Sequence, residues 1–162
     1  MMDHGLIHGI RALLSGQNRM QIARTFTFDA AHRLPHHDGK CHRMHGHGYR
    51  LELVFSGTPR LPRPEEAQSG FLVDFGLLDR IIRTELITPK LDHFLLNESL
   101  PELPYHSAEY LAAWIVGWCM THLDGRKELG TTRIDRARLW ESERAWAEAS
   151  RADAMALGFA NA

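Results

Sequence analysis

Six of the eleven histidines lie between residues 32 and 47, where the sequence is HRLPHHDGKCHRMHGH. His45 and His47 are two residues apart, so on an extended strand both imidazoles point to the same face. His32 lies upstream, on what we expect to be the preceding strand, and can reach that face from the side. Three converging imidazoles suit Zn²⁺, and three protein ligands leave a fourth position for water or substrate. We therefore predict a catalytic zinc site.

The other histidines of this stretch, His36, His37 and His42, are competing ligands that spacing does not exclude. They lie in a turn-rich segment with Pro35 and Gly39, where the direction of a side chain cannot be predicted. The alternative to a metal site is a cluster of histidines exposed on a loop.

Cys41 lies four residues before His45 and has three interpretations. It can be a small buried side chain, but its neighbours Lys40, His42 and Arg43 argue against burial. It can be a fourth zinc ligand, which would make the site closed and structural. It can be a reactive thiolate, because flanking cations and a nearby metal favour loss of the thiol proton. The residues alone leave the last two open.

Two acidic positions are further candidates. Asp92 precedes His93, and a loop can fold the carboxylate back to orient the imidazole as a general base or acid. A salt bridge or cap at a helix end is the alternative. Glu141 ends a strand-like run and can bind a guanidine-like edge through two parallel hydrogen bonds, although a solvated surface carboxylate explains it equally. Cys119, in a helical pattern between Trp118 and Met120, is predicted to pack in the core.

Composition is typical of one globular domain: 162 residues, 44% apolar and 24% charged. We assign residues 20–162 to it and residues 1–19 to an extension, either a short amphipathic helix or a misassigned start. The net charge of −1 favours neither nucleic acid nor anionic membrane as a partner. No apolar run approaches the length of a membrane span. Two cysteines in different contexts make a disulfide framework improbable and favour a reducing cytoplasm.

Periodicity predicts the elements that must position these residues. Alternating apolar residues predict an antiparallel pair of strands over 20–28 and 49–55, with Arg24 breaking the pattern. Residues 57–70 hold three prolines and are predicted to be irregular. A helix is expected after Asp74, then a loop over residues 88–106.

Ser107 is expected to cap a second helix, with Glu109 near its positive end. The apolar face of that helix is Leu111, Trp114, Ile115 and Trp118. Residues 134–141 again have strand periodicity. In the tail after Glu141, strand alternation and alanine-rich helical character compete. The predicted order is strand, strand, helix, helix, strand and a final strand.

Together these motifs resemble the 6-pyruvoyl-tetrahydropterin synthase family, and within it the bacterial 6-carboxytetrahydropterin synthases. The element Cys-x-x-x-His-Gly-His, with Ala-Ala-His upstream and Leu-Asp-His downstream, is highly specific. The matching segments run in family order over about residues 20 to 149: Phe26–Leu34, Cys41–Tyr49, Gly70–Phe75, Leu91–Asn97, Glu109–Ile115 and Glu141.

The resemblance implies an α+β tunnelling fold, with four antiparallel strands and two helices between the second and third. It implies trimers stacked into hexamers, with active sites at subunit interfaces. The implied residues are the zinc ligands His32, His45 and His47, the catalytic triad Cys41, Asp92 and His93, and the pterin anchor Glu141. Family members usually read Pro-Thr-x-Glu before the second helix, where this chain has His106-Ser107-Ala108-Glu109. Ser107 keeps the hydroxyl that contacts the pterin.

The implied reaction is zinc-dependent conversion of 7,8-dihydroneopterin triphosphate to 6-carboxytetrahydropterin, with release of acetaldehyde and triphosphate. That product feeds 7-deazaguanine and queuosine synthesis. One alternative is the sister reaction that yields 6-pyruvoyl-tetrahydropterin. The other is a non-catalytic zinc module in which Cys41 closes the metal site.

Overall fold

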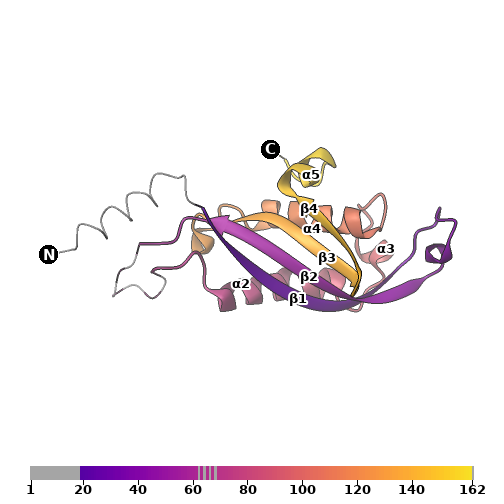
Figure 1. Ribbon diagram of the computed structural model, residues 1–162, viewed down its shortest axis with the longest axis horizontal. Coiled ribbons are helices and arrows are strands. Elements are labelled where there is room, and N and C mark those ends of the chain that lie inside the picture. Colours follow the sequence, from indigo (N-terminus) through magenta and orange to yellow (C-terminus); the bar gives the residue numbers. More distant parts are fainter. Residues whose placement is uncertain (1–18, 62, 64, 66, 68, 162) are drawn as a thin grey trace.

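A four-stranded antiparallel sheet, in the order β1-β2-β3-β4, forms one layer of the protein (Figure 1). The computed structural model describes residues 19–161 except 62, 64, 66 and 68. The extension predicted for residues 1–19 therefore lies almost wholly outside the described residues. The strands are β1 (Met20–His32), β2 (His45–Gly57), β3 (Arg133–Ser142) and β4 (Ala145–Ser150). The predicted α+β architecture is confirmed, because the main helices fall between β2 and β3.

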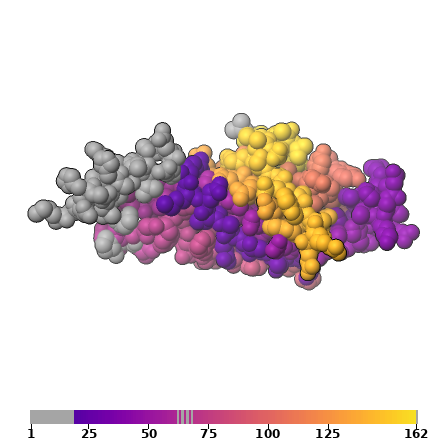
Figure 2. Space-filling model, viewed as in Figure 1, coloured from indigo at the N-terminus to yellow at the C-terminus, as the bar shows by residue number. Residues whose placement is uncertain are grey.

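The first two strands are longer than predicted. Their ladder continues until His32 faces His45, so three of the clustered histidines are strand residues. The connection between these strands contains the 3₁₀ turn η1 (Lys40–His42) and projects from one end of the molecule (Figure 2). The predicted strand pair is thus confirmed, with a shorter loop than the pattern suggested.

One face of the sheet packs against the helices. Phe26 and Phe28 on β1, and Leu51 and Leu53 on β2, are buried there at alternate positions. Arg24 lies on the same face and broke the apolar pattern. Its guanidinium forms an ion pair with Asp79 on the first helix, so this charge ties the helix to the edge strand.

The first helix, α2 (Phe75–Ile82), begins where Asp74 accepts a hydrogen bond from the backbone N–H of Leu77 (2.8 Å), as predicted. It continues as the π-helix η2 (Arg83–Leu91). Pro89 has no N–H to donate, and at the end of η2 the N–H of Asp92 donates to the carbonyl oxygen of Ile87 (2.9 Å), in the wider pattern of a π-helix. The loop predicted over residues 88–106 is therefore wrong at its start, and it also contains the short helix α3 (Leu96–Ser99).

The long helix α4 (Ala108–His122) is buried along most of its length, because β3 and β4 cover one side and α5 (Arg151–Ala156) another. Its predicted apolar face is confirmed. Ser107 occupies the N-cap position, but its side chain makes no capping hydrogen bond. Gly117 allows a close approach: a Cβ there would lie 2.5 Å from the carbonyl oxygen of Phe159. The 3₁₀ turn η3 (Lys127–Leu129) leads into β3.

The tail after Glu141 contains both structures that competed in the sequence, first β4 and then α5. Ser150 ends the strand and caps the helix through a reciprocal capping box with Asp153. None of the helices that the structure describes has the length and apolar character needed to cross a bilayer.

Candidate active site

Three imidazoles meet at the end of the β1–β2 ladder. His32 pairs with His45, and Ala30 pairs with His47, so all three rings lie on the helix-facing side of the sheet. They continue the buried stripe of Leu51 and Tyr49 past the end of the apolar core. Ring centroids are 4.6 to 5.1 Å apart, and one nitrogen from each ring lies within 4.8 Å of the other two.

Backbone carbonyls orient two of these rings. The Nδ1–H of His32 donates to the carbonyl oxygen of His106 (2.7 Å), and that of His45 donates to the carbonyl oxygen of Arg43 (2.8 Å). Each bond leaves the Nε2 lone pair available to a metal ion, which is how most metal-binding histidines are held. The predicted convergence of His32, His45 and His47 is thereby confirmed as geometry.

The unsatisfied atoms of the cluster fit a cation. The Nε2 atoms of His32 and His47 are buried and have no hydrogen-bond partner in the protein, although buried polar atoms normally have one. Burial is the largest influence on His32 and lowers its pKa, which favours the neutral imidazole that a metal requires. Among the described residues these three are the group whose ligand atoms converge, and they can hold a metal ion.

A cavity of about 600 Å³ opens beside the imidazoles. Its lining includes six of the eight residues that the sequence predicted for the site: His32, His45, His47, Cys41, Ser107 and Glu141. Asp92 and His93 do not line it. The edge strand β4 forms part of its wall through Trp146, whose side chain is exposed.

Cys41 reaches this cavity from the turn η1 and is partly exposed. The buried-core interpretation of Cys41 is therefore wrong, whereas Cys119 is fully buried in α4 as predicted. Burial raises the pKa of the Cys119 thiol far above its usual value, so that thiol stays protonated. Cys41 is not part of the converging metal-binding group.

Glu141 lies near the end of β3, and its Oε1 atom is 3.7 Å from Nε2 of His32. The buried hydroxyl of Tyr49 belongs to the same neighbourhood. Burial, followed by the negative charge of Glu141, raises the pKa of Tyr49 well beyond its ordinary range. A neutral tyrosine and a carboxylate therefore border the imidazoles.

Asp92 and His93 contact each other on a different part of the surface. His93 Nδ1 lies 3.0 Å from Asp92 Oδ1, and the backbone N–H of Asp29 donates to the same carboxylate (3.1 Å). That backbone bond is the main reason why the pKa of Asp92 is lowered, and His93 adds to it. Of the two alternatives for this pair, the structure shows the carboxylate folded back against the imidazole, and its role as a general base or acid stays a prediction.

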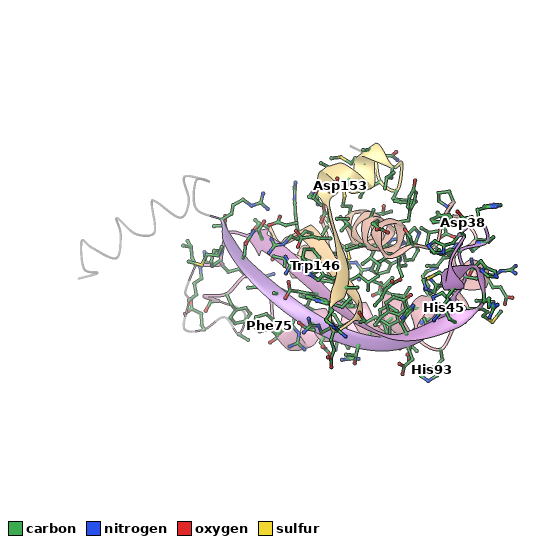
Figure 3. All side chains as sticks on the ribbon, turned by 45° about the vertical axis from the view of Figure 1, so that its right-hand side comes forward. Asp38, His45, Phe75, His93, Trp146 and Asp153 are labelled. Carbon is green, nitrogen blue, oxygen red and sulfur yellow. The ribbon has the colours of Figure 1, made fainter. Side chains whose placement is uncertain are left out.

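The position of this pair follows from the backbone. His93 has a positive φ of 63°, and its N–H donates to Asp29 on the outer edge of β1 (2.6 Å). A residue other than glycine rarely adopts this conformation, which often marks functional positions. His93 projects beyond the curved edge strand, away from His45 (Figure 3), and its side chain is 77% exposed.

The sequence profile of the 6-pyruvoyl tetrahydropterin synthase family matches residues 21–152. The chain belongs to this family. A 6-carboxy-5,6,7,8-tetrahydropterin synthase of Synechocystis is 42% identical over 94 residues, which cover 58% of this chain and 70% of that protein. A provisionally named enzyme of the same kind from Archaeoglobus fulgidus is 32% identical over 135 residues, covering 83% and 99%.

Solved structures agree on the fold. The 6-pyruvoyl tetrahydropterin synthase of Caenorhabditis elegans superposes with a TM-score of 0.65 over 82% of this chain and 96% of that one, at 18% identity. The corresponding Plasmodium falciparum enzyme gives 0.56 over 82% and 98%, at 19% identity. The tunnelling fold expected from the resemblance is therefore confirmed.

Three residues have places at the site that the sequence did not predict. Tyr49 was assigned only to a strand, although alternation from His45 and His47 places it next on the same face. His37 was weighed as a metal ligand, but it lines the cavity with its Nδ1 accepting from the N–H of Gly39 (2.9 Å). His106 was noted as a departure from the family, and no local signal indicated that its carbonyl holds His32.

Proposed function

We propose that this protein is a zinc-dependent carbon–carbon lyase, a 6-carboxy-5,6,7,8-tetrahydropterin synthase. Its substrate would be 7,8-dihydroneopterin triphosphate, and its other products acetaldehyde and triphosphate, with one water consumed to balance the atoms. The proposal follows the names of the relatives from Synechocystis and Archaeoglobus fulgidus. It would place the protein in 7-deazaguanine and queuosine synthesis, in a reducing cytoplasm where Cys41 stays a free thiol.

One observation carries the proposal. Two buried Nε2 atoms without hydrogen-bond partners belong to a three-histidine cluster whose ligand atoms converge, and Cys41 and Glu141 line the same cavity. Three nitrogen ligands with an open fourth position are typical of catalytic zinc. Zinc bound there would polarise substrate oxygens and acidify the neighbouring C–H and O–H groups.

The residues of the chain would divide the remaining work. Glu141 would accept two hydrogen bonds from the amino-pyrimidine edge of the pterin and orient it, with Ser107 as a second contact. Cys41 would transfer a proton at the side chain of the substrate. His93 would transfer another, with Asp92 fixing the tautomer of its ring.

A second copy of the chain would unite these groups. Asp92 and His93 lie along β1, at one edge of the sheet, and the cavity with Cys41 borders β4, at the other. Copies that associate edge to edge would bring the pair of one chain to the cavity of the next, since a free strand edge readily pairs. We therefore propose a trimer-based homo-oligomer, with hexamers as stacked trimers.

The decisive experiment is incubation of the zinc-loaded protein with 7,8-dihydroneopterin triphosphate, followed by mass analysis of the pterin and an acetaldehyde assay. Equal amounts of 6-carboxytetrahydropterin and acetaldehyde are expected. Formation of 6-pyruvoyl-tetrahydropterin without acetaldehyde would favour the sister reaction. An unchanged substrate, together with a sulfur ligand in the zinc X-ray absorption spectrum, would favour a structural zinc module.

A further inference from the structure

The metal ligand His32 is held by groups distant in the sequence. Its Nδ1–H donates to the carbonyl oxygen of His106, 74 residues away. His32 is only 2% exposed, so the position of that carbonyl decides where its Nε2 atom points. Whatever fixes residue 106 therefore fixes a ligand of the proposed metal site.

The ring of His106 is bound at both nitrogens. Its Nε2–H donates to the carbonyl oxygen of Leu100 (3.1 Å), since a carbonyl can only accept. Its Nδ1 is then the acceptor for an N–H of the Asn97 side chain (3.1 Å). The two bonds agree on one neutral tautomer, so the ring and the backbone that carries it are locked in a single orientation.

Asn97 also binds the residue next to His32. Its Oδ1 accepts from the N–H of Arg33 (2.9 Å), and its amide group donates to the carbonyl oxygen of Arg33 (3.1 Å). The Asn97 side chain therefore binds the backbone of Arg33, next to His32, and also the ring of His106, the residue whose backbone carbonyl orients His32. Both donor hydrogens of Asn97 are used, which leaves little freedom for the amide to rotate.

We propose that Asn97 and His106 are positioning residues for the metal centre, forming a clamp that presets His32. The clamp presupposes the proposed metal site. It closes a loop of contacts from His32 to His106, then to Asn97, and back through the backbone of Arg33. Its value is preorganisation: a ligand already in place loses less freedom when the ion binds.

The segment that carries Asn97 gives the clamp a second connection. Residues 93–97 run beside β1. Ala31 forms a β-bridge with Leu95, and the N–H of Ala31 donates to the carbonyl oxygen of Phe94 (3.0 Å). The exposed His93 lies at one end of this segment and Asn97 at the other. The placement of the proposed acid–base pair and that of the metal ligand thus depend on the same stretch of backbone.

The test is zinc affinity of the full-length protein, measured by competition with a chelating dye, without substrate. Asn97→Ala removes three hydrogen bonds and should weaken zinc binding about 10-fold to 100-fold, the usual effect of losing such support. His106→Ala keeps the backbone carbonyl and the grip on Arg33, so its loss should be smaller. The matched control is Ser99→Ala on the same helix, whose buried hydroxyl has no partner and whose removal should leave affinity unchanged.

A double-mutant cycle separates positioning from general destabilisation. In a His32→Ala background, Asn97→Ala should have almost no further effect on zinc affinity, because the ligand that it positions is gone. Wild-type zinc affinity in both Asn97→Ala and His106→Ala, or equal losses with and without His32, would overturn the clamp and leave the proposed function standing. A wild-type protein that binds no zinc would overturn both proposals, whatever the variants do.

Discussion

The Oε1 atom of Glu141 lies 3.7 Å from Nε2 of His32. The residue proposed to anchor the pterin therefore borders a residue proposed to hold the metal, although 109 positions separate them in the sequence. Antiparallel pairing explains this proximity, since the C-terminal ends of β1 and β3 and the N-terminal end of β2 lie at the same end of the sheet. A ring bound by Glu141 would lie within reach of an ion bound by the histidines.

Metal content is the first prediction. His45→Ala or His47→Ala should reduce bound zinc from about one ion per chain to a small fraction, because two nitrogen ligands hold Zn²⁺ poorly. Elemental analysis after dialysis measures this directly. His42→Ala is the control: its Nδ1 lies 2.7 Å from the carbonyl oxygen of Gly39, and it is outside the converging group. Undiminished zinc in both ligand variants would rule out the assignment.

Cys41 provides the second prediction, which separates the two interpretations that the sequence left open. Cys41→Ala should retain zinc and fold while losing on the order of 10²-fold or more in turnover, the typical contribution of an acid–base group. Zinc content and steady-state rates measure the two effects. Cys119→Ala should keep its turnover, because that thiol is buried in the core. Loss of zinc from Cys41→Ala would instead support a closed structural site.

Sharing of the site between chains is the third prediction. Cys41→Ala and His93→Ala should each keep about 1% of the wild-type turnover or less, yet a mixture whose subunits have exchanged should recover at most about a quarter of the wild-type rate. Each shared site takes residue 41 from one chain and residue 93 from its neighbour. Each of the two residues is intact in about half of the cases, so about a quarter of the sites are complete. Cys41→Ala mixed with Glu141→Gln is the control, since both residues line one cavity and cannot complement. Absence of recovery in the first mixture would argue for a site within one chain.

Acid stability is the fourth prediction. Glu85 forms a two-bond ion pair with Arg126 (2.9 and 2.6 Å), and these hydrogen bonds lower its pKa from the ordinary value of 4.5. A lowered folded-state pKa means that the pair stabilises the protein above pH 4.5 and ceases to do so as pH falls through the lower value. The difference in Tm between wild type and Glu85→Gln should therefore be largest near neutrality and vanish in strong acid. A difference independent of pH would contradict the ion pair.

Much of the fold and part of the site could be predicted because they depend on local repetition. The two-residue spacing of His45 and His47 sets their common face wherever a strand forms, and Asp74 is a helix cap by its type and position. Arg24 shows the limit: it interrupts an apolar stripe, and only its partner Asp79, 55 residues away, explains it.

The remaining features depend on contacts that no short window contains. Helix η2 widens around Pro89, whereas the usual expectation is that proline ends a helix. The location of His93 follows from its bond to Asp29 across the edge of the sheet. The hydroxyl of Ser107 was expected to cap α4 and does not, and the residue lines the cavity instead.

Pterin binding is the fifth prediction. A pterin presents an amino group and a ring N–H side by side, and a carboxylate at position 141 can accept both bonds. Glu141→Gln keeps the shape but removes the charge. It also replaces one acceptor oxygen with an NH₂ donor, which would face a donor of the pterin ring. The unpaired group should cost about 1–3 kcal/mol of binding free energy, or about 5-fold to 150-fold in Kd, with zinc content and fold intact.

The matched control for this change is Glu143→Gln, which makes the same substitution two residues later, at an exposed position outside the cavity. Titration of a dihydropterin lacking the phosphate chain into the zinc-loaded protein isolates the ring contact from any contact to phosphate. Near-normal affinity in Glu141→Gln would mean that the ring is anchored elsewhere. Ser107 would then be the next side chain to replace, because it lines the same cavity.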